Sequence, residues 1–125
     1  MEEYLLDTNI LIYSLGQNRK VNAALAKLKR GYFFVSVISD FEFLVGTKNE
    51  KDLKEAEEFL SHTVPLDLRR ETVREALKLQ RENPGKLQFK DLLIAATAKI
   101  EKLTLVTADK DFKSIKGLKV KLVQP

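Results

Sequence analysis

The chain has 125 residues, no cysteine, one histidine, and a formal net charge of +4 from 22 basic and 18 acidic residues. This length suits a single domain, residues 1–125, and the lack of cysteine excludes disulfides, thiolate metal ligands and a cysteine nucleophile. An acidic start and apolar runs far below the roughly 20 residues that span a bilayer predict a cytoplasmic protein without a membrane segment.

Short apolar segments with the composition of β-strands recur along the chain. In order they are residues 3–6, 32–37, a possible strand at 63–66 shortened by Pro65, 103–106 and 119–123. The segment "YFFV" in the second is continuously apolar, as in a strand buried on both faces of a parallel sheet. The last segment alternates apolar and basic residues, which is typical of an edge strand.

Between these segments, apolar residues recur three or four positions apart, which predicts helices. The helical positions are Val21, Leu25 and Leu28, then Leu53, Ala56, Phe59 and Leu60, then Val73, Ala76 and Leu77, then Leu92, Ala95 and Ala96. The "ENPG" at 82–85 predicts a helix stop. Strands that alternate with helices predict an α/β fold, a three-layer α/β/α sandwich around a mainly parallel central sheet.

Four carboxylates occur where predicted strands end or helices begin. Asp7 and Asp109 follow strands, Glu42 falls in the first turn of the helix after residues 32–37, and Asp91 precedes an apolar helix. In open α/β sheets, ligands bind beyond the carboxyl ends of the strands. We therefore expect the four acids to share one edge of the sheet.

Each acid, taken alone, also has a purely structural interpretation. Asp7 and Asp109 fit helix N-caps, Ser39 and Glu42 have the spacing of a capping box, and Asp91 suits a helix N-terminus. Capping does not require a carboxylate, however, because serine, threonine or asparagine serves equally well. Capping therefore leaves unexplained why all four positions are acidic.

Convergence of the four acids would demand a cation. Two carboxylates about 4 Å apart repel by roughly 4 kcal/mol at an effective dielectric near 20. An all-oxygen cluster selects a hard cation, Mg²⁺ or Mn²⁺, which can activate water for attack on a phosphodiester. The residues thus indicate a metal-dependent phosphodiesterase.

The motifs "LLDTNILIY", "SVISDFEFLVG", "KDLLIAATA" and "LVTADKDF" resemble, in order, the acidic motifs of the PIN domain family, and most closely its VapC-type toxins. The ending "IKGLKVKLVQP" resembles the family's final strand. The resemblance implies a PIN-like sandwich, an Mg²⁺- or Mn²⁺-dependent endoribonuclease acting on RNA, a separately encoded antitoxin partner, and a homodimer.

Position by position, the resemblance places the family's acids on Asp7, Glu42, Asp91 and Asp109. Asp7 and Asp91 are expected to bind the metal directly, and Asp109 to complete the cluster directly or through water. Glu42 is expected to be part of the site and to orient or deprotonate the attacking water.

Neighbouring polar residues receive weaker assignments. Asp40 is interpreted as a surface residue, and Asp111 as a cap or a secondary contributor. The hydroxyls of Thr8, Ser36 and Thr107 either orient water or phosphate or cap the backbone. His62, at a predicted helix end, is interpreted as a surface residue, not a catalyst.

With the four site acids set aside, the net charge of +4 becomes +8. We expect basic residues near the motifs, among them Lys48, Lys90, Lys110 and Lys113, to receive a polyanion. The apolar residues Tyr13, Leu15, Leu44 and Val45 are left open as core, dimer or partner contacts.

Other functions remain as alternatives. The first is a PIN-like module that binds RNA or protein without cutting. A haloacid-dehalogenase-type phosphatase needs a second aspartate where Asn9 stands, and a receiver domain needs an acidic pair that "LLDTN" lacks. A scaffold of charged helices would explain residues 47–59 but not the acidic motifs.

Overall fold

A computed structural model describes residues 2–28 and 32–125 and contains one five-stranded sheet in the order β3-β2-β1-β4-β5. The strands are β1 (Glu3–Leu6), β2 (Tyr32–Ser36), β3 (Val64–Leu66), β4 (Thr104–Thr107) and β5 (Val120–Leu122). All four strand pairings are parallel, and Leu5 of β1 lies opposite Phe34 of β2 and Leu105 of β4. The possible strand at residues 63–66 is therefore confirmed as β3, which pairs with β2.

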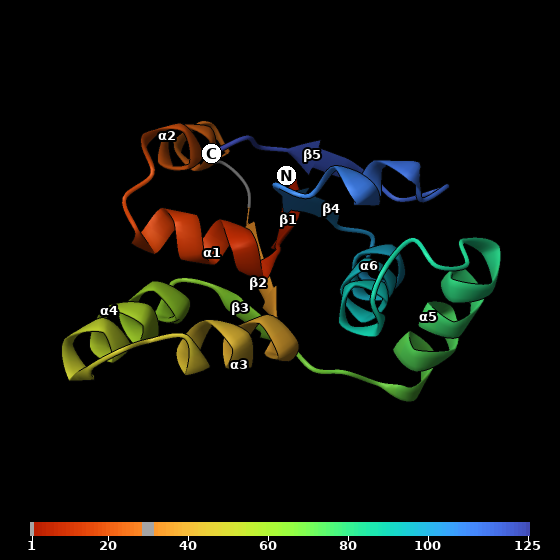
Figure 1. Cartoon of the computed structure of the whole chain (residues 1–125), viewed down its shortest axis with the longest axis horizontal. Coiled ribbons are helices and arrows are strands. Elements are labelled where there is room, and N and C mark those ends of the chain that lie inside the picture. Colours follow the sequence, from red (N-terminus) through yellow and green to blue (C-terminus); the bar gives the residue numbers. More distant parts are fainter. Residues whose placement is uncertain (1, 29–31) are drawn as a thin grey trace.

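Helices cover both faces of the sheet (Figure 1). One face carries α1 (Thr8–Leu15), α2 (Arg19–Lys27), α3 (Val37–Val45) and α4 (Glu50–Ser61). The other carries α5 (Arg70–Glu82) and α6 (Phe89–Glu101), and the short 3-10 helix η1 (Lys110–Ser114) follows β4. The predicted α/β/α sandwich is confirmed.

Two hydrophobic clusters hold the layers together, one on each face of the sheet. Leu5 and Leu105 pack with residues of α5 and α6, whereas their neighbours Leu6 and Val106 pack with residues of α1 and α3. Successive side chains of a strand point to opposite faces, so one strand serves both clusters. Burying each leucine stabilises the fold by about 1.5–3 kcal/mol.

Two local predictions are wrong, and both concern helix starts. Ser39 is not a cap: α3 already begins at Val37, and the Ser36 side chain caps it by accepting from the Ile38 amide. Glu42 therefore lies in the second turn of α3, not the first. Asp91 does not precede its helix but lies in the first turn of α6. The list of apolar spacings did not include α1, although the interpretation of Asp7 as an N-cap implied a helix there, and that helix is confirmed.

In the two described ranges, the helices are too short or too polar for any of them to cross a membrane.

Candidate functional site

Asp7 lies at the centre of the edge formed by the carboxyl ends of the strands, called here the carboxyl edge. It follows β1 directly, is only 4% exposed, and caps α1 by accepting from the Thr8 amide at 2.8 Å. Its other oxygen accepts from the Thr107 hydroxyl at 2.7 Å and from the Asn9 amide group at 3.3 Å. The predicted capping role is real, yet it uses only one of the two oxygens.

The ends of β1 and β4 are joined by a short polar network. Thr107 Oγ1 accepts from the Asp109 amide at 3.1 Å while it donates to Asp7. Asn9 Oδ1 accepts from the Ala108 amide at 3.2 Å. Because β1 and β4 are neighbours, these bonds fix Asp7 and the backbone of Asp109 next to each other.

Glu42 reaches the same edge from α3. One carboxylate oxygen accepts from the Thr8 hydroxyl at 2.8 Å, and that hydroxyl lies 2.9 Å from Ser39 Oγ. The other oxygen forms an ion pair with Lys90 Nζ at 2.5 Å. Burial would raise the pKa of Glu42, but the hydrogen bonds from Lys90 and Thr8 and the Lys90 charge outweigh it and lower the pKa.

Asp91 enters from α6 on the opposite face of the sheet and is half-buried. Burial, followed by the negative charges of Asp7 and Asp109, raises its pKa to about 6, although the charge of Lys90 acts in the opposite direction. The pKa of Asp7 is also raised, mainly by burial, against the hydrogen bonds from Thr107 and Thr8. The charges of Asp109 and Glu42 add to this rise. The four acids are thus close enough to act on one another.

The acids do not form a closed ligand set in this side-chain arrangement. Within residues 2–28 and 32–125, no three histidine, aspartate or glutamate side chains are grouped as metal ligands. Local bonds explain this: Glu42 is turned to Lys90, and Asp109 Oδ1 caps η1 by accepting from the Asp111 amide at 2.9 Å. The donors are all hard oxygens, the ligand type that Mg²⁺ and Mn²⁺ prefer.

The structure also shows how exposed the other acidic positions and the histidine are. Asp40 is half-buried, and burial raises its pKa. Asp111 is exposed. His62 is confirmed as an exposed helix-end residue, 3.2 Å from Glu58.

Sequence reasoning missed the site roles of Asn9 and Ser39 and the pairing partner of Lys90. Asn9 could have been found, because it stands two residues after Asp7 at the same strand-to-helix junction. Ser39 was assigned to the helix terminus, whereas its hydroxyl is buried beside Thr8. The Lys90–Glu42 pair joins residues 48 apart, and no local spacing indicates it.

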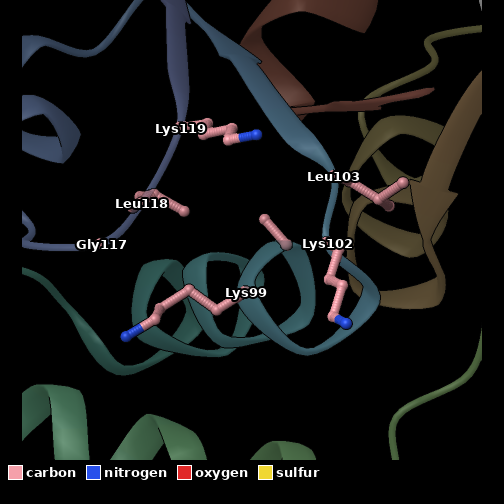
Figure 2. Close-up of a pocket in the computed structure, with 7 residues that line it drawn as sticks. Lys99, Lys102, Leu103, Gly117, Leu118 and Lys119 are labelled. Atoms are coloured by element: carbon pink, nitrogen blue, oxygen red, sulfur yellow. The ribbon is translucent and has the colours of Figure 1, made fainter. Parts of the chain in front are cut away.

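A pocket at the opposite edge, where β4 and β5 begin, has a different character. We call this edge of the sheet the amino edge. The pocket has a volume of about 210 Å³ and is lined by Lys99, Lys102 and Lys119 together with Leu103, Gly117 and Leu118. Figure 2 shows that the lysine side chains point in different directions and do not meet at one point. Lys99 Nζ also lies 3.5 Å from Glu75. The carboxyl edge is therefore the better candidate site.

Comparisons with known proteins show the family and the fold of this chain. The PIN domain family matches residues 4–118. VapBC2 from Rickettsia felis, solved bound to a DNA fragment from its promoter, has 29% identity and a TM-score of 0.85, over 96% of this chain and 98% of that chain. A toxin–antitoxin complex from Klebsiella pneumoniae has 29% identity and a TM-score of 0.79, over 92% and 94% of the two chains.

DNA-bound VapBC from Salmonella typhimurium superposes with a TM-score of 0.83 over 97% of this chain and 98% of that chain. Its identity of 23% supports the fold alone. A search of curated proteins finds no significant match.

Proposed function

This chain belongs to the PIN domain family, and from that premise we propose that it is an Mg²⁺- or Mn²⁺-dependent endoribonuclease, the toxin of a toxin–antitoxin pair. The observation that carries the proposal is the arrangement of four acids at one edge of the sheet: Asp7 after β1, Glu42 on α3, Asp91 on α6 and Asp109 after β4. Burial and the charges of Asp7 and Asp109 raise the pKa of Asp91 to about 6, which agrees with this arrangement. Buried and half-buried acids from separate elements that repel one another are a typical functional-site arrangement, and a cation relieves the repulsion.

In this proposal Asp7, Asp91 and Asp109 hold the cation, and Glu42 faces the attacking water. A bound divalent cation would neutralise the scissile phosphate and lower the pKa of water. The lowered pKa of Glu42 makes it a weak base, so it is better suited to orient water than to remove its proton. Thr107 and Asn9 keep the Asp7 carboxylate in place through their hydrogen bonds.

The proposed chemistry leaves a 5′-phosphate and a 3′-hydroxyl. Nucleases that use the 2′-hydroxyl as nucleophile usually rely on histidine as acid and base. The one histidine, His62, is exposed at the end of α4 and pairs with Glu58. Water would therefore attack in line and expel the 3′-oxygen, and the 2′-hydroxyl would not be required.

End-group analysis of a cut RNA oligonucleotide tests this proposal. We expect cleavage only with added Mg²⁺ or Mn²⁺, products with 5′-phosphates, and continued cleavage when one 2′-deoxy residue replaces the ribose at the cut site. Products with 2′,3′-cyclic phosphate, or full protection by the deoxy residue, would contradict the mechanism.

We also propose a separately encoded antitoxin as partner, because two similar structures are toxin–antitoxin complexes. A surface groove of about 430 Å³ between α1, α3 and α4 offers a docking surface, with Ile12, Leu15 and Phe43 as its apolar part and Lys48, Asp52 and Glu55 as its charged part. Co-purification with the product of the adjacent reading frame tests this partner.

A homodimer is the second proposed assembly. Phe41 is 70% and Phe89 is 77% exposed, on α3 and at the start of α6, next to the site. Exposed aromatic side chains of this size favour association. Sedimentation of the purified chain tests the dimer, and a monomer at micromolar concentration would contradict it.

The alternative is a PIN-like module that binds RNA or protein without cutting. The observation that favours it is the ion pair between Glu42 and Lys90, since it occupies a carboxylate that catalysis would use. RNA binding that persists without any cleavage at millimolar Mn²⁺ would support this alternative over the nuclease.

A further inference from the structure

Lys90 brings a fixed positive charge into the acidic site. It stands at the start of α6, while its partner Glu42 belongs to α3 on the opposite face of the sheet. Their ion pair of 2.5 Å therefore bridges the two helical layers across the carboxyl edge. The charges of Asp91 and Asp7 also act on the Lys90 ammonium.

Both oxygens of Glu42 are engaged in this state. Oε1 accepts from the Thr8 hydroxyl, and Oε2 pairs with Lys90. A divalent cation that took Glu42 as a ligand, directly or through water, would meet the ammonium at the same carboxylate. The cation and the Lys90 ammonium repel each other when both contact the same carboxylate, so only one of them can hold Glu42 closely.

We propose that Lys90 is a built-in counter-ion that competes with the divalent cation for Glu42. It stabilises the metal-free site and weakens metal binding, so that the site fills only when the ion is abundant. This inference rests on the proposed function, since it requires a cation at the acids. It concerns how the chain's own charge sets the affinity of that site.

A matched comparison is available within the chain. Lys110 follows Asp109 as Lys90 precedes Asp91, but Lys110 is exposed, and within the described residues it forms no ion pair. Substituting it removes one positive charge beside a site acid without releasing Glu42. Lys110→Gln is therefore the control for Lys90→Gln.

The experiment measures Mn²⁺ affinity by titration calorimetry, without RNA. We expect Lys90→Gln to bind Mn²⁺ about tenfold more tightly than the unchanged protein, and Lys110→Gln to differ by about twofold or less. The gain is limited because the side chains of Lys90 and Glu42 are 43% and 27% exposed. Lys90→Arg keeps the ion pair and should keep the original affinity.

A double substitution separates competition from simple repulsion. In a Glu42→Gln background, Lys90→Gln should change Mn²⁺ affinity by only about twofold, because the contested carboxylate is gone. A full tenfold gain in that background would show that Lys90 acts by general charge repulsion, and it would overturn the competition.

Thermal melting of the metal-free protein gives an independent measurement. Lys90→Gln should melt at a slightly lower temperature than Lys110→Gln, by about 1–3 °C, since Glu42 loses the counter-ion of a partly exposed pair. Equal melting temperatures, or equal Mn²⁺ affinity in the unchanged and Lys90→Gln proteins, would overturn the inference while the metal site stands. No Mn²⁺ binding by either protein would overturn the inference and the proposed function together, whereas binding by Lys90→Gln alone would support both.

Discussion

The two edges of the sheet carry opposite charges, and helix α6 spans both. Its first turn holds Asp91 at the carboxyl edge, and its last turn and C-cap hold Lys99 and Lys102 at the amino edge. The helix dipole favours an acidic residue at the start and basic residues at the end of any helix. Charge placement along one helix therefore does not identify a functional site.

Convergence distinguishes the two edges. At the carboxyl edge, side chains from the ends of β1 and β4 and from α3 and α6 face one another. Burial raises the pKa values of Asp7 and Asp91, and the negative charges of the neighbouring acids raise them further. At the amino edge, the lysine side chains point apart and Lys99 is already next to Glu75 (Figure 2). A surface can carry charges separately at little cost, but a group of facing carboxylates requires a function or a counter-ion.

The largest effect should come from removing one carboxylate at the carboxyl edge. We expect Asp7→Asn to lower the rate of RNA cleavage by about a hundredfold or more, since a lost direct metal ligand costs more than a lost supporting residue. Asparagine can still cap α1, so circular dichroism should show an unchanged fold. Lys102→Gln at the amino edge should cleave at the original rate, and an equal loss there would erase the distinction between the edges.

The pH dependence of metal binding is the next largest effect. Asp91 has a pKa raised to about 6, and a carboxyl group must lose its proton before it binds a cation. Mn²⁺ affinity should therefore fall by about tenfold for each pH unit below about 6. Calorimetry between pH 5 and 7 measures this, and Asp91→Asn should give a flatter profile. Affinity that stays constant down to pH 5 would mean that Asp91 is not a ligand.

RNA binding should distinguish the lysines of the two edges. The measurement uses the Asp7→Asn variant, which is expected not to cleave the RNA. In this variant, substituting both Lys110→Gln and Lys113→Gln should weaken RNA binding severalfold. The slope of log affinity against log salt should fall by about one for each lost phosphate contact. Lys102→Gln with Lys119→Gln should leave both quantities unchanged. Filter binding at several salt concentrations measures them. If the second pair weakened binding equally, the RNA path would include the amino edge.

The smallest effect concerns the stability of the metal-free protein. Because the folded-state pKa of Asp91 is raised, its ionised form is disfavoured in the fold, and stability falls as pH rises from about 4 through about 6. Asp91→Asn should remove this penalty and raise the melting temperature at pH 7 by about 3 °C, with no gain at pH 4. The exposed Asp111→Asn should change neither value, and a gain at pH 4 would point to another cause.

The sequence predicted the sheet and its acidic edge because both depend on local signals. Apolar runs that end in a carboxylate mark a strand and its carboxyl end at once, as with Asp7 after β1. The helices predicted between successive strands then imply that the strands are parallel, and parallel strands have their carboxyl ends at the same edge. The placement of Asp7, Glu42, Asp91 and Asp109 around one edge followed from these two rules, while their roles as metal ligands stay predictions.

The start of α3 could not be predicted, because Ser36 and Ser39 are both suitable caps. The choice between them is made by β2, whose Ser36 is paired with Leu66 of β3 and therefore belongs to the sheet. The ion pair of Lys90 and Glu42 was equally hidden, since it depends on how two helices from different layers lie across the edge. Both features depend on contacts between residues far apart in the chain, which a short stretch of sequence does not reveal.

The bond between Thr107 and Asp7 joins residues 100 apart in the chain, and it has a consequence for synthesis. Chains emerge from the ribosome with the N-terminus first, so β1 exists long before β4 can pair with it. Until residues 104–109 have emerged, Asp7 lacks its threonine partner and Asp109 is missing altogether. A chain still in synthesis therefore lacks part of the acidic site, and the nuclease proposed here would be complete only in the last stage of its own translation.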